Sequence, residues 1–392
     1  MTENKAAPTL DVVVTARPSW ARVKSLVENY ALITDTSKIR VLFVGPAVSK
    51  RYGDVTSQVP VNVEFETMQT LSESDGLDAV AQTCASGSQL LIHRWSSKRP
   101  DCTLVIADRT ETLGVAMAAS VMQIPLIHLQ GGEISGSIDD KIRDANSKLA
   151  DLHLTTNDYT AKRLISMGEP KERVIPIGCP SIDLVRQMIE SGSAHFPENG
   201  LASEMGGVGG DFSLNNPFGI IMFHPDTLNE FENTEWVNAL IEIADKSDYN
   251  WFWFWPNPDH GSHFVSHQIR KAREHGRILN VRFVINLPPE RFVHLASKAV
   301  ILVGNSSFGI RESAYLGLPV MNLGKRQMGR QKVANVRDVP DLISSDELRM
   351  LISTHASQGR LDSSDLYGDG RSGFRGASYI ANWAPTLKTR SS

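Results

Sequence analysis

Acidic side chains and an arginine gather in the stretch HLQGGEISGSIDDKIRDA, residues 128–145. Glu133 follows two glycines, and Asp139 and Asp140 stand one helical turn or less before Arg143. Carboxylates in such a cluster can act as bases or accept hydrogen bonds from a substrate. Capping of the following helix is the alternative for a single aspartate, but it does not account for all four charged side chains. We therefore expect this stretch to form part of an active site.

Two other strand ends carry charged side chains. Asp108 and Arg109 follow the run TLVIA and open a helix, so Asp108 is a candidate base or hydrogen-bond acceptor. The alternative is that Asp108 or Thr110 only caps this helix. Arg17 stands between the first strand and a helix that starts near Ser19. Such a position suits a side chain that meets an anion, although a plain surface arginine is the alternative.

A further set lies in the second half of the chain. His224 ends the run FGIIMFH, and the run AVILVGN, whose last residues are Gly304 and an asparagine, leads into Ser306 and Ser307. Hydroxyls and backbone N–H groups at a helix N-terminus form a good phosphate site, and an ordinary serine cap is the alternative. Glu312 follows and can accept hydrogen bonds from ribose hydroxyls. The chain has no Walker sequence, so the pattern is not a P-loop.

The remaining chemical signals are weaker. His128 lies within a predicted strand, where a lone histidine is more often a core residue. Gly131 and Gly132 allow the backbone to come close to a ligand or to another loop. HExxH and GxSxG are both missing, which argues against a zinc hydrolase and a serine triad, and we expect no metal site. No GxGxxG follows the first strand, so no dinucleotide fingerprint is present.

The elements that position these residues alternate between short β-branched strands and helices. Strands are predicted at 10–16, 41–45, 103–108, 125–129, 153–156, 173–178, 218–225, 251–256, 281–285, 299–305 and 319–324. This alternation predicts βαβ units and parallel sheets. The expected fold class is α/β, with two Rossmann-like domains and a cleft between them. Ligands of such sheets bind at the carboxyl ends of the strands, where the charged residues stand.

The domain boundaries follow from a change in composition. Residues 191–217 are rich in Gly, Ser and Asn and are predicted to be a linker or insert. Residues 1–190 then form an N-terminal domain and residues 218–370 a C-terminal domain. The tail, residues 371–392, is expected to pack back on the N-terminal domain.

Composition excludes several classes of protein. The net charge is −4 and no basic run is present, which argues against binding to nucleic acid. No apolar stretch approaches the roughly 20 residues that span a bilayer, and the run WFWFW is predicted to be a buried strand. The N-terminus lacks the apolar core of a signal peptide. Three scattered cysteines, Cys84, Cys102 and Cys179, fit a reducing compartment, so we expect a cytoplasmic protein.

Eight motifs, taken together and in order, resemble one known family. They are ARPSWARVKSL (16–26), ADRTETL (107–113), HLQGGEISGSIDDKIRDANSKLADLH (128–153), GCPSIDL (178–184), HPDT (224–227), PNPDHGS (256–262), GNSSFGIRE (304–312) and NLGKRQMGR (322–330). The chain resembles the hydrolysing UDP-N-acetylglucosamine 2-epimerases of sialic-acid and nonulosonate pathways. The resemblance covers about residues 10–340, apart from the predicted insert.

This resemblance implies the GT-B fold, with the sugar on the N-terminal side and UDP on the C-terminal side. It implies anti elimination of UDP to a 2-acetamidoglucal, followed by addition of water to give N-acetylmannosamine. No cofactor is needed, and the family suggests a homodimer or homotetramer. The implied catalytic set is Asp108, Glu133, Asp139, Arg109, His224 and the position of Gln130. The implied substrate-binding set is Arg17, His128, Arg143, Asn257, Gly304, Ser306, Ser307, Glu312 and Arg326.

The sequence departs from the family pattern at two positions. Gln130 stands where the family has a catalytic glutamate, and an amide is not a base near neutral pH. Asp144 follows Arg143 where the family has a histidine, so a carboxylate could have changed sides. Two alternatives stay open for this reason. One is a non-hydrolysing epimerase or another GT-B nucleotide-sugar enzyme, and the other is a non-catalytic protein that binds UDP-sugars.

Overall fold

The computed structural model describes residues 6–48, 55–70, 76–136, 139–191, 199–225, 230–256 and 262–387. The chain divides into two compact units. The first unit comprises residues 1–133, 138–186 and 367–392, and the second comprises residues 134–137 and 187–366. The first unit therefore includes a segment that follows the second unit in sequence.

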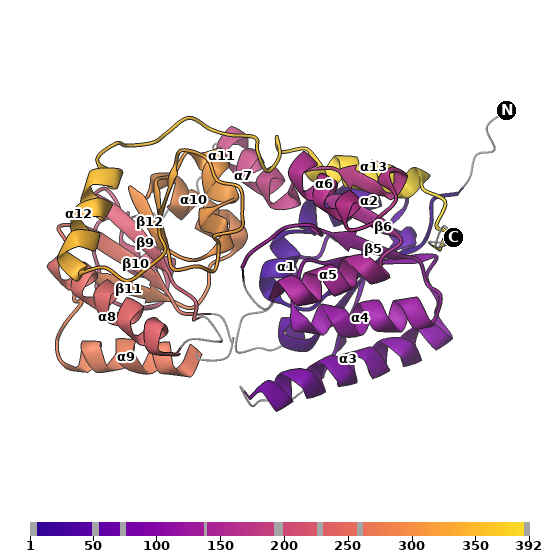
Figure 1. Ribbon diagram of the computed structural model, residues 1–392, viewed down its shortest axis with the longest axis horizontal. Coiled ribbons are helices and arrows are strands. Elements are labelled where there is room, and N and C mark those ends of the chain that lie inside the picture. Colours follow the sequence, from indigo (N-terminus) through magenta and orange to yellow (C-terminus); the bar gives the residue numbers. More distant parts are fainter. Residues whose placement is uncertain are drawn as a thin grey trace. The chain divides into compact units, whose positions relative to one another are not determined.

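Seven parallel strands form the sheet of the first unit, in the order β3-β2-β1-β4-β5-β6-β7 (Figure 1). They are β1 (Leu10–Val14), β2 (Ile39–Val44), β3 (Glu64–Met68), β4 (Cys102–Ile106), β5 (Leu126–Leu129), β6 (Leu152–Thr155) and β7 (Val174–Pro176). The strand order reverses between β1 and β4. Ligands of doubly wound sheets bind beyond the carboxyl ends of the strands at such a switch point.

Helices cover both faces of this sheet. They are α1 (Arg17–Ala21), α2 (Lys24–Ile33), α3 (Leu77–Ser97), α4 (Thr110–Val121), α5 (Asp139–Leu149), α6 (Asp158–Ser166), α7 (Pro180–Ser191) and α13 (Ser372–Asn382). Val12 belongs to one core cluster with Leu26 of α2 and Ala377 of α13. Its neighbour Val13 belongs to another, with Leu91 of α3. The two-residue period of a strand explains this division, since successive side chains point to opposite faces.

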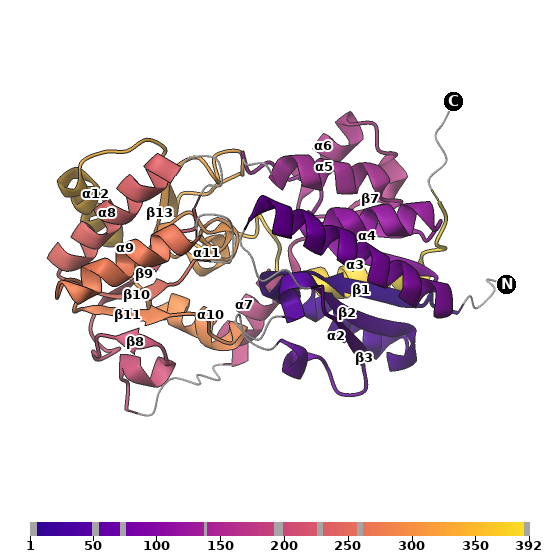
Figure 2. The ribbon, with the colours of Figure 1, turned by 90° about the horizontal axis from the view of Figure 1, so that it is seen from below.

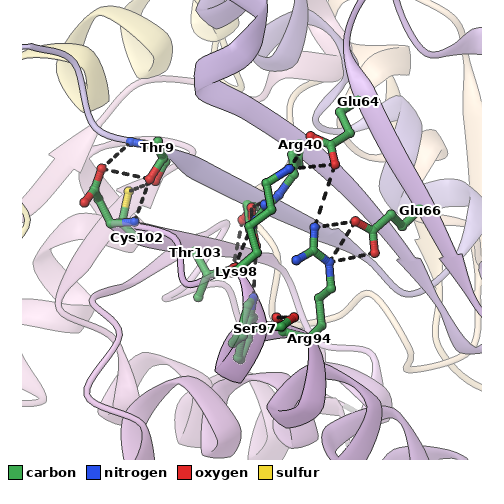
Figure 3. A network of polar contacts seen from close by, with 12 residues as sticks. Thr9, Arg40, Glu64, Glu66, Arg94, Ser97, Lys98, Cys102 and Thr103 are labelled. Carbon is green, nitrogen blue, oxygen red and sulfur yellow. Dashed lines mark hydrogen bonds and ion pairs between the residues drawn. The ribbon is translucent and has the colours of Figure 1, made fainter.

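A network of ion pairs closes the amino edge of the same sheet (Figure 3). The Arg40 guanidinium donates to both carboxylate oxygens of Asp11, at 2.9 and 2.8 Å, and to the carbonyl oxygen of Lys98 at 3.2 Å. Trp95 donates its indole N–H to the same carboxylate at 3.0 Å. Arg94 of α3 pairs with Glu66 of β3. The buried charges at this edge are thus neutralised within the unit.

The second unit contains another seven-stranded sheet, in the order β14-β13-β12-β9-β10-β11-β8 (Figure 2). Its strands are β8 (Val208–Gly209), β9 (Phe218–Met222), β10 (Asn250–Phe254), β11 (Val281–Val284), β12 (Ile301–Gly304), β13 (Val320–Leu323) and β14 (Val336–Val339). Its helices are α8 (Glu230–Lys246), α9 (Ser262–Glu274), α10 (Pro289–Lys298), α11 (Glu312–Leu316) and α12 (Ser345–Ala356). Only β8 pairs antiparallel, and the switch point lies between β9 and β12.

The run WFWFW forms the central strand β10, as predicted. Trp251 and Trp253 belong to the core cluster that includes residues of α8 and α9. Phe252 and Phe254 belong to the cluster on the opposite side. Both faces of the strand are therefore buried, which explains why the run is apolar at every position instead of alternating.

The architecture confirms the predicted α/β class with two Rossmann-like units. The predicted linker differs from the structure, because residues 199–217 belong to the second unit and contain β8 and a 3-10 helix at Ala202–Met205. Gly207 and Gly209 have φ of 77° and 110°, and their backbone lies directly against β11. The linker was predicted from these glycines, but they instead allow the edge strand β8 to lie close to β11. No helix in the described part of the chain has the length and apolar character needed to cross a membrane.

Candidate active site

Arg143 gathers carboxylates at the carboxyl edge of the first sheet. Its guanidinium, whose side chain is only 1% exposed, pairs with Asp108 after β4 and with Asp140 on its own helix. It also donates to the carbonyl oxygen of Glu133 at 2.8 Å. The predicted charged stretches 107–113 and 128–145 therefore meet at one buried cation. This arrangement fixes the direction of the Asp108 carboxylate, which remains 15% exposed.

The backbone before Asp108 is held by His128. Ala107 has φ of 57°, a left-handed conformation that is costly for a residue with a Cβ. Nε2 of His128 lies 2.9 Å from the Ala107 carbonyl oxygen, and Nδ1 lies 3.0 Å from the Ser147 hydroxyl. Burial lowers the pKa of His128 to about 4, so the ring is neutral, with Nε2–H donating and Nδ1 accepting.

This geometry corrects one predicted substrate ligand. His128 is fully buried, and both of its ring nitrogens have partners within the unit. It therefore supports the loop that carries Asp108 rather than contacting a ligand. Gly131 is part of the same support, because a Cβ there would come within 2.8 Å of the Ser147 hydroxyl. Only glycine leaves room for the hydrogen bond between Ser147 and His128.

The start of α4 settles whether Asp108 is only a helix cap. The residue at the N-cap position is Arg109, without a side-chain capping bond. Thr112 donates from its backbone and its hydroxyl to the Arg109 carbonyl oxygen, at 2.9 and 2.5 Å. Asn146 of α5 donates to the Thr112 hydroxyl at 2.7 Å. The capping function thus falls to other groups, and Asp108 is committed to Arg143.

Gln130 occupies an unusual position just beyond β5. Its φ is 67°, its side chain is buried, and its backbone N–H donates to Leu154 at 2.8 Å. The side-chain amide donates to the sulfur of Cys179 at 2.9 Å. Cys179 directly precedes α7 and also lies 2.9 Å from the Ser181 hydroxyl. The amide therefore ties the loop after β5 to the start of α7.

Asp144 does not replace the missing family carboxylate. It forms two hydrogen bonds with Arg163 of α6, at 2.7 and 2.8 Å. This pair anchors α5 to α6 and engages both oxygens of the Asp144 carboxylate. Asp139 lies in the first turn of α5 and is half-buried, and Glu133 is buried.

Arg17 opens α1 directly after β1, across the switch point from Asp108. Burial lowers its pKa to about 10, still far above neutral pH, so the side chain remains a cation. A partly desolvated guanidinium at a switch point is suited to an anionic ligand group.

The second unit has its own polar cluster at the end of β9 and β12. The backbone N–H of His224 donates to the side-chain oxygen of Asn305 at 2.8 Å, and Asn305 donates back to the His224 carbonyl at 2.8 Å. Gln327 donates to the Asn305 carbonyl oxygen at 3.0 Å. Gly304 has φ of 142°, and a Cβ there would collide with the backbone of Met222. These contacts fix His224 beside Ser306.

The serines lead into a shorter helix than the sequence predicts. A 3-10 turn spans Ser307–Gly309, and α11 is confined to Glu312–Leu316. The Ser306 side chain accepts from the N–H of Phe308, which satisfies the cap alternative for this one serine. A continuous helix dipole from Ser306 is therefore absent, and an anion here would depend on hydroxyl and N–H donors and on nearby cations.

Arg311 supplies such a cation and was not among the predicted site residues. It is 1% exposed and donates to the Ser307 hydroxyl at 3.0 Å, and its Nε lies 4.0 Å from Glu312. Its sequence signal was weak, because arginine in a predicted amphipathic helix is normally solvated. Arg326 is half-buried in the loop after β13. Asn257 lies outside the described residues.

No group of three His, Cys, Asp or Glu side chains in the described ranges is arranged to hold a metal ion. The chemistry that the two clusters offer is therefore that of carboxylates, guanidinium groups and hydroxyls. Carboxylates at the first switch point can move protons, and donors at the second can hold an oxyanion.

Known proteins share both the sequence pattern and the fold. A sequence model of the family described as UDP-N-acetylglucosamine 2-epimerase matches residues 31–381. The chain is 29% identical over 282 residues to the UDP-N,N'-diacetylbacillosamine 2-epimerase (hydrolyzing) of Legionella pneumophila, covering 72% of this chain and 71% of the relative. It is 25% identical to the GDP/UDP-N,N'-diacetylbacillosamine 2-epimerase (hydrolyzing) of Campylobacter jejuni, covering 83% of each.

The fold is similar to that of a solved structure, the Methanocaldococcus jannaschii UDP-GlcNAc 2-epimerase in complex with UDP-GlcNAc and UDP. The TM-score is 0.76 at 14% identity, over 93% of this chain and 97% of that chain. This likeness confirms the predicted GT-B type of fold. Because the family pattern extends over most of the chain, this protein belongs to the UDP-N-acetylglucosamine 2-epimerase family.

Proposed function

We propose that this chain is a hydrolysing 2-epimerase that converts UDP-N-acetylglucosamine, or a close UDP-2-acetamido sugar, to the 2-epimeric free sugar and UDP. The observation that carries the proposal is the Asp108–Arg143–Asp140 cluster at the switch point of the first sheet. Elimination across C1 and C2 of a sugar needs a base and a fixed negative charge near C1. The two relatives named as hydrolyzing enzymes support the hydrolytic outcome.

We assign the carboxylates to separate tasks. Asp108, whose direction is fixed by Arg143, stabilises the positive charge that develops at C1. We assign removal of the C2 proton to Asp139, which lies half-buried in the first turn of α5. The electron pair of the C–H bond then forms the C1=C2 double bond as the C1–O bond breaks and its electrons leave with UDP. Water next adds its oxygen to C1 and a proton to C2 from the opposite face.

The second unit is assigned to the leaving diphosphate. Ser307 and Arg311 form a hydrogen-bonded donor pair, and the buried guanidinium keeps its charge close to the hydroxyl. His224 is held by Asn305 at the adjoining strand end, where its ring can donate to the departing oxygen. We assign to Glu312 the acceptance of hydrogen bonds from ribose hydroxyls, and to Arg326 the supply of a further cation. Donors of this kind lower the energy of the departing UDP anion.

The experiment is a UDP-release assay in deuterated water, with the sugar product identified by proton NMR. UDP-N-acetylglucosamine and UDP-N,N'-diacetylbacillosamine serve as donors, each also tested as the GDP form. We expect UDP release, a 2-epimeric free sugar and one deuterium at C2. A product that retains its nucleotide would instead identify a non-hydrolysing epimerase, and absence of both UDP and 2-epimer from every donor would refute epimerase activity.

Variants of two aspartates on α5 test the assignment of the base. Asp139→Asn should abolish deuterium incorporation at C2 while leaving UDP binding intact. Asp144→Asn is the matched control, since it lies on the same helix but pairs with Arg163. If the Asp139 variant still exchanged the C2 proton at the wild-type rate, the base would be another group.

A non-catalytic UDP-sugar-binding protein is the second candidate, and Gln130 is the observation that favours it. The family's carboxylate is replaced there by an amide that donates to Cys179. Calorimetry separates the candidates, because a binding protein would take up UDP-sugar tightly without turnover in the NMR assay.

A further inference from the structure

Three buried side chains fasten helix α5 to the turn at residues 107–112. They are Arg143, Asn146 and Ser147. Arg143 pairs with Asp108, and Ser147 reaches the turn through the ring of His128. Both ribbon views place α4, which begins in this turn, beside α5 (Figures 1 and 2). The turn and the helix are therefore held together by side-chain contacts.

Asn146 makes the uncharged contact in the middle of this set. Its side-chain N–H group donates to the Thr112 hydroxyl at 2.7 Å and to the Ala107 carbonyl oxygen at 3.4 Å. The Thr112 hydroxyl donates in turn to the Arg109 carbonyl oxygen at 2.5 Å. A buried hydroxyl that donates and accepts at the same time has a fixed orientation. Asn146 thus holds the turn at two points, one before Asp108 and one after it.

Asp139 lies on the same side of α5 as these contacts. Asp139, Arg143 and Asn146 are spaced i, i+4 and i+7, which brings them onto one stripe of a helix. The stripe faces the turn, because Arg143 and Asn146 both contact residues there. Asp139 stands about 10 Å along the helix axis from Asn146, at about 1.5 Å per residue. A change in the seating of α5 at Asn146 therefore moves Asp139 relative to the turn.

We propose that Asn146 is a positioning residue that sets the separation between the Asp108 and Asp139 carboxylates. The inference rests on the function proposed above, in which these carboxylates act at C1 and C2 of one sugar. Asp108 follows β4 and Asp139 opens α5, so their separation depends on how α5 is seated on the turn. Asn146 acts through Thr112 and Ala107, because an amide neither gives nor takes a proton near neutral pH.

A small error in this separation has a large effect on rate. A misplacement of about 1 Å, caused by a change away from the reacting atoms, can cost about 10²-fold. Without the amide, α5 loses two of its hydrogen bonds to the turn, while Arg143 can still pair with Asp108. The groups that are assigned to UDP lie in the second unit and are not altered. The expected signature is therefore a lower kcat at an unchanged KM.

The test compares variants of both hydrogen-bond partners in the UDP-release assay. Asn146→Leu should lower kcat about 10–100-fold and leave KM within about twofold of wild type. Thr112→Val, which loses the hydroxyl but keeps a similar shape, should lower kcat by a similar factor. Thr112→Ser keeps the hydroxyl and should retain near-normal kcat. The double variant Asn146→Leu/Thr112→Val should lose no more than either single variant, because both changes break the same bond.

Asn335→Leu is the matched control for the loss of a buried amide. Asn335 of the second unit is also buried, and it donates to the Ser313 hydroxyl at 3.1 Å and to the Leu318 carbonyl oxygen at 2.7 Å. This variant should lose a similar amount of stability and keep its kcat per folded molecule. Equal losses of kcat in Asn146→Leu and Asn335→Leu would overturn the positioning role.

Hydrogen exchange measured by mass spectrometry separates a failure of this inference from a failure of the proposed function. The amides of residues 143–149 should exchange about fivefold faster in Asn146→Leu and Thr112→Val than in wild type, and Asn335→Leu should leave them unchanged. A wild-type protein without turnover that shows this pattern would refute the proposed function and still support the seating of α5 by Asn146. Unchanged exchange in Asn146→Leu would overturn the inference, whether or not the wild type is active.

Discussion

The two edges of the first sheet each bury an arginine against carboxylates, but they do so differently. At the amino edge, Arg40 forms a bidentate pair with Asp11, and Trp95 donates to the same carboxylate. At the carboxyl edge, Arg143 is shared between Asp108 and Asp140, which come from different elements. The Asp11 side chain is 2% exposed, whereas those of Asp108 and Asp140 are 15% and 20% exposed.

This difference separates a pair that holds the fold from a cluster that is available for chemistry. The Asp11 carboxylate accepts from Arg40 and Trp95 and is almost fully buried, so a ligand has little access to it. A single guanidinium shared by two half-open carboxylates fixes their directions and leaves oxygen atoms for a substrate. The carboxyl edge is also where doubly wound sheets bind ligands.

The largest loss of stability is expected from a change at the amino edge. Asp11→Ala leaves the buried Arg40 guanidinium without its counter-ion and should lower the free energy of unfolding by about 3–5 kcal/mol. Turnover per folded molecule should be unchanged. Urea denaturation measures the loss, and Lys98→Ala is the control, because its exposed pair with Glu64 is worth less than about 1 kcal/mol. Equal losses in the two variants would contradict this view of the edge.

Replacement of Arg143 should affect turnover more than stability, which is the reverse of the pattern expected for Asp11. Arg143→Gln should lower kcat by roughly 10²–10³-fold, because Asp108 loses its fixed direction in the site. The cost in stability should be smaller than for Asp11, since both partner carboxylates reach water. Steady-state kinetics and thermal melting give the two values. Arg163→Gln, which breaks the pair with Asp144 on the same helix, should retain near-normal kcat.

The pH dependence of stability should show that His128, which hydrogen-bonds to the backbone just before Asp108, is neutral in the folded chain. The pKa of His128 is lowered from 6.5 to about 4 in the folded chain, so the unfolded chain takes up the proton first as the pH falls. Stability is therefore full above pH 6.5 and is lost towards pH 4, by up to about 3 kcal/mol. Urea titrations from pH 7.5 to 4.5 should show this loss in wild type. His128→Asn should lack this part of the slope, and the exposed His93→Gln should keep it.

Replacement of Gln130 tests whether its side-chain amide contributes to stability rather than to catalysis. Gln130→Glu removes the N–H donor to Cys179 and adds a buried carboxyl, so stability should fall by about 1–3 kcal/mol at pH 7.5. We expect no increase in kcat. The isosteric but uncharged Gln130→Met separates the loss of the donor from the added charge. A tenfold gain in kcat for the glutamate variant would show that the carboxylate of the family pattern suits this pocket.

The smallest effect is expected in the second unit. Ser307→Ala removes the hydroxyl that accepts from Arg311 and should weaken UDP binding about fivefold, near 1 kcal/mol. Titration calorimetry with UDP measures this change. Ser313→Ala is the control, because its hydroxyl is buried and donates to Gly309 rather than facing a ligand. An equal loss in both variants would assign the effect to packing.

Much of the fold could be predicted, because the central strands are continuous apolar runs. The run at 10–16 contains β1, and WFWFW supplies four of the five residues of β10. Strand β3, EFETM, was not predicted, because it is an edge strand with mostly exposed side chains. Strand β8 was hidden by glycines that resemble a linker. Edge strands bury few side chains, so they lack the apolar pattern from which a strand is predicted.

The candidate site was predictable only in part. Asp108 and Arg143 could be placed at one sheet edge, because both follow strands of the same parallel sheet. The partners of His128 could not, since they depend on the register of β4 and β5 and on the left-handed turn at Ala107. The contact between Gln130 and Cys179, 49 residues apart, arises only when the loops after β5 and β7 meet.

The chain returns to the first unit after the second unit, which affects the order in which the two units can fold during synthesis. Helix α13 supplies core residues Ala377 and Ile380 beneath β1, and Asp183 accepts from the N–H groups of Ser372 and Gly373 at its start. These residues leave the ribosome after residues 187–366, which make up nearly all of the second unit. Domains generally fold in the order in which they emerge. Here the unit that is begun first is completed only after the second unit has been made, so one apolar face of its sheet lacks part of its cover until α13 has been synthesised.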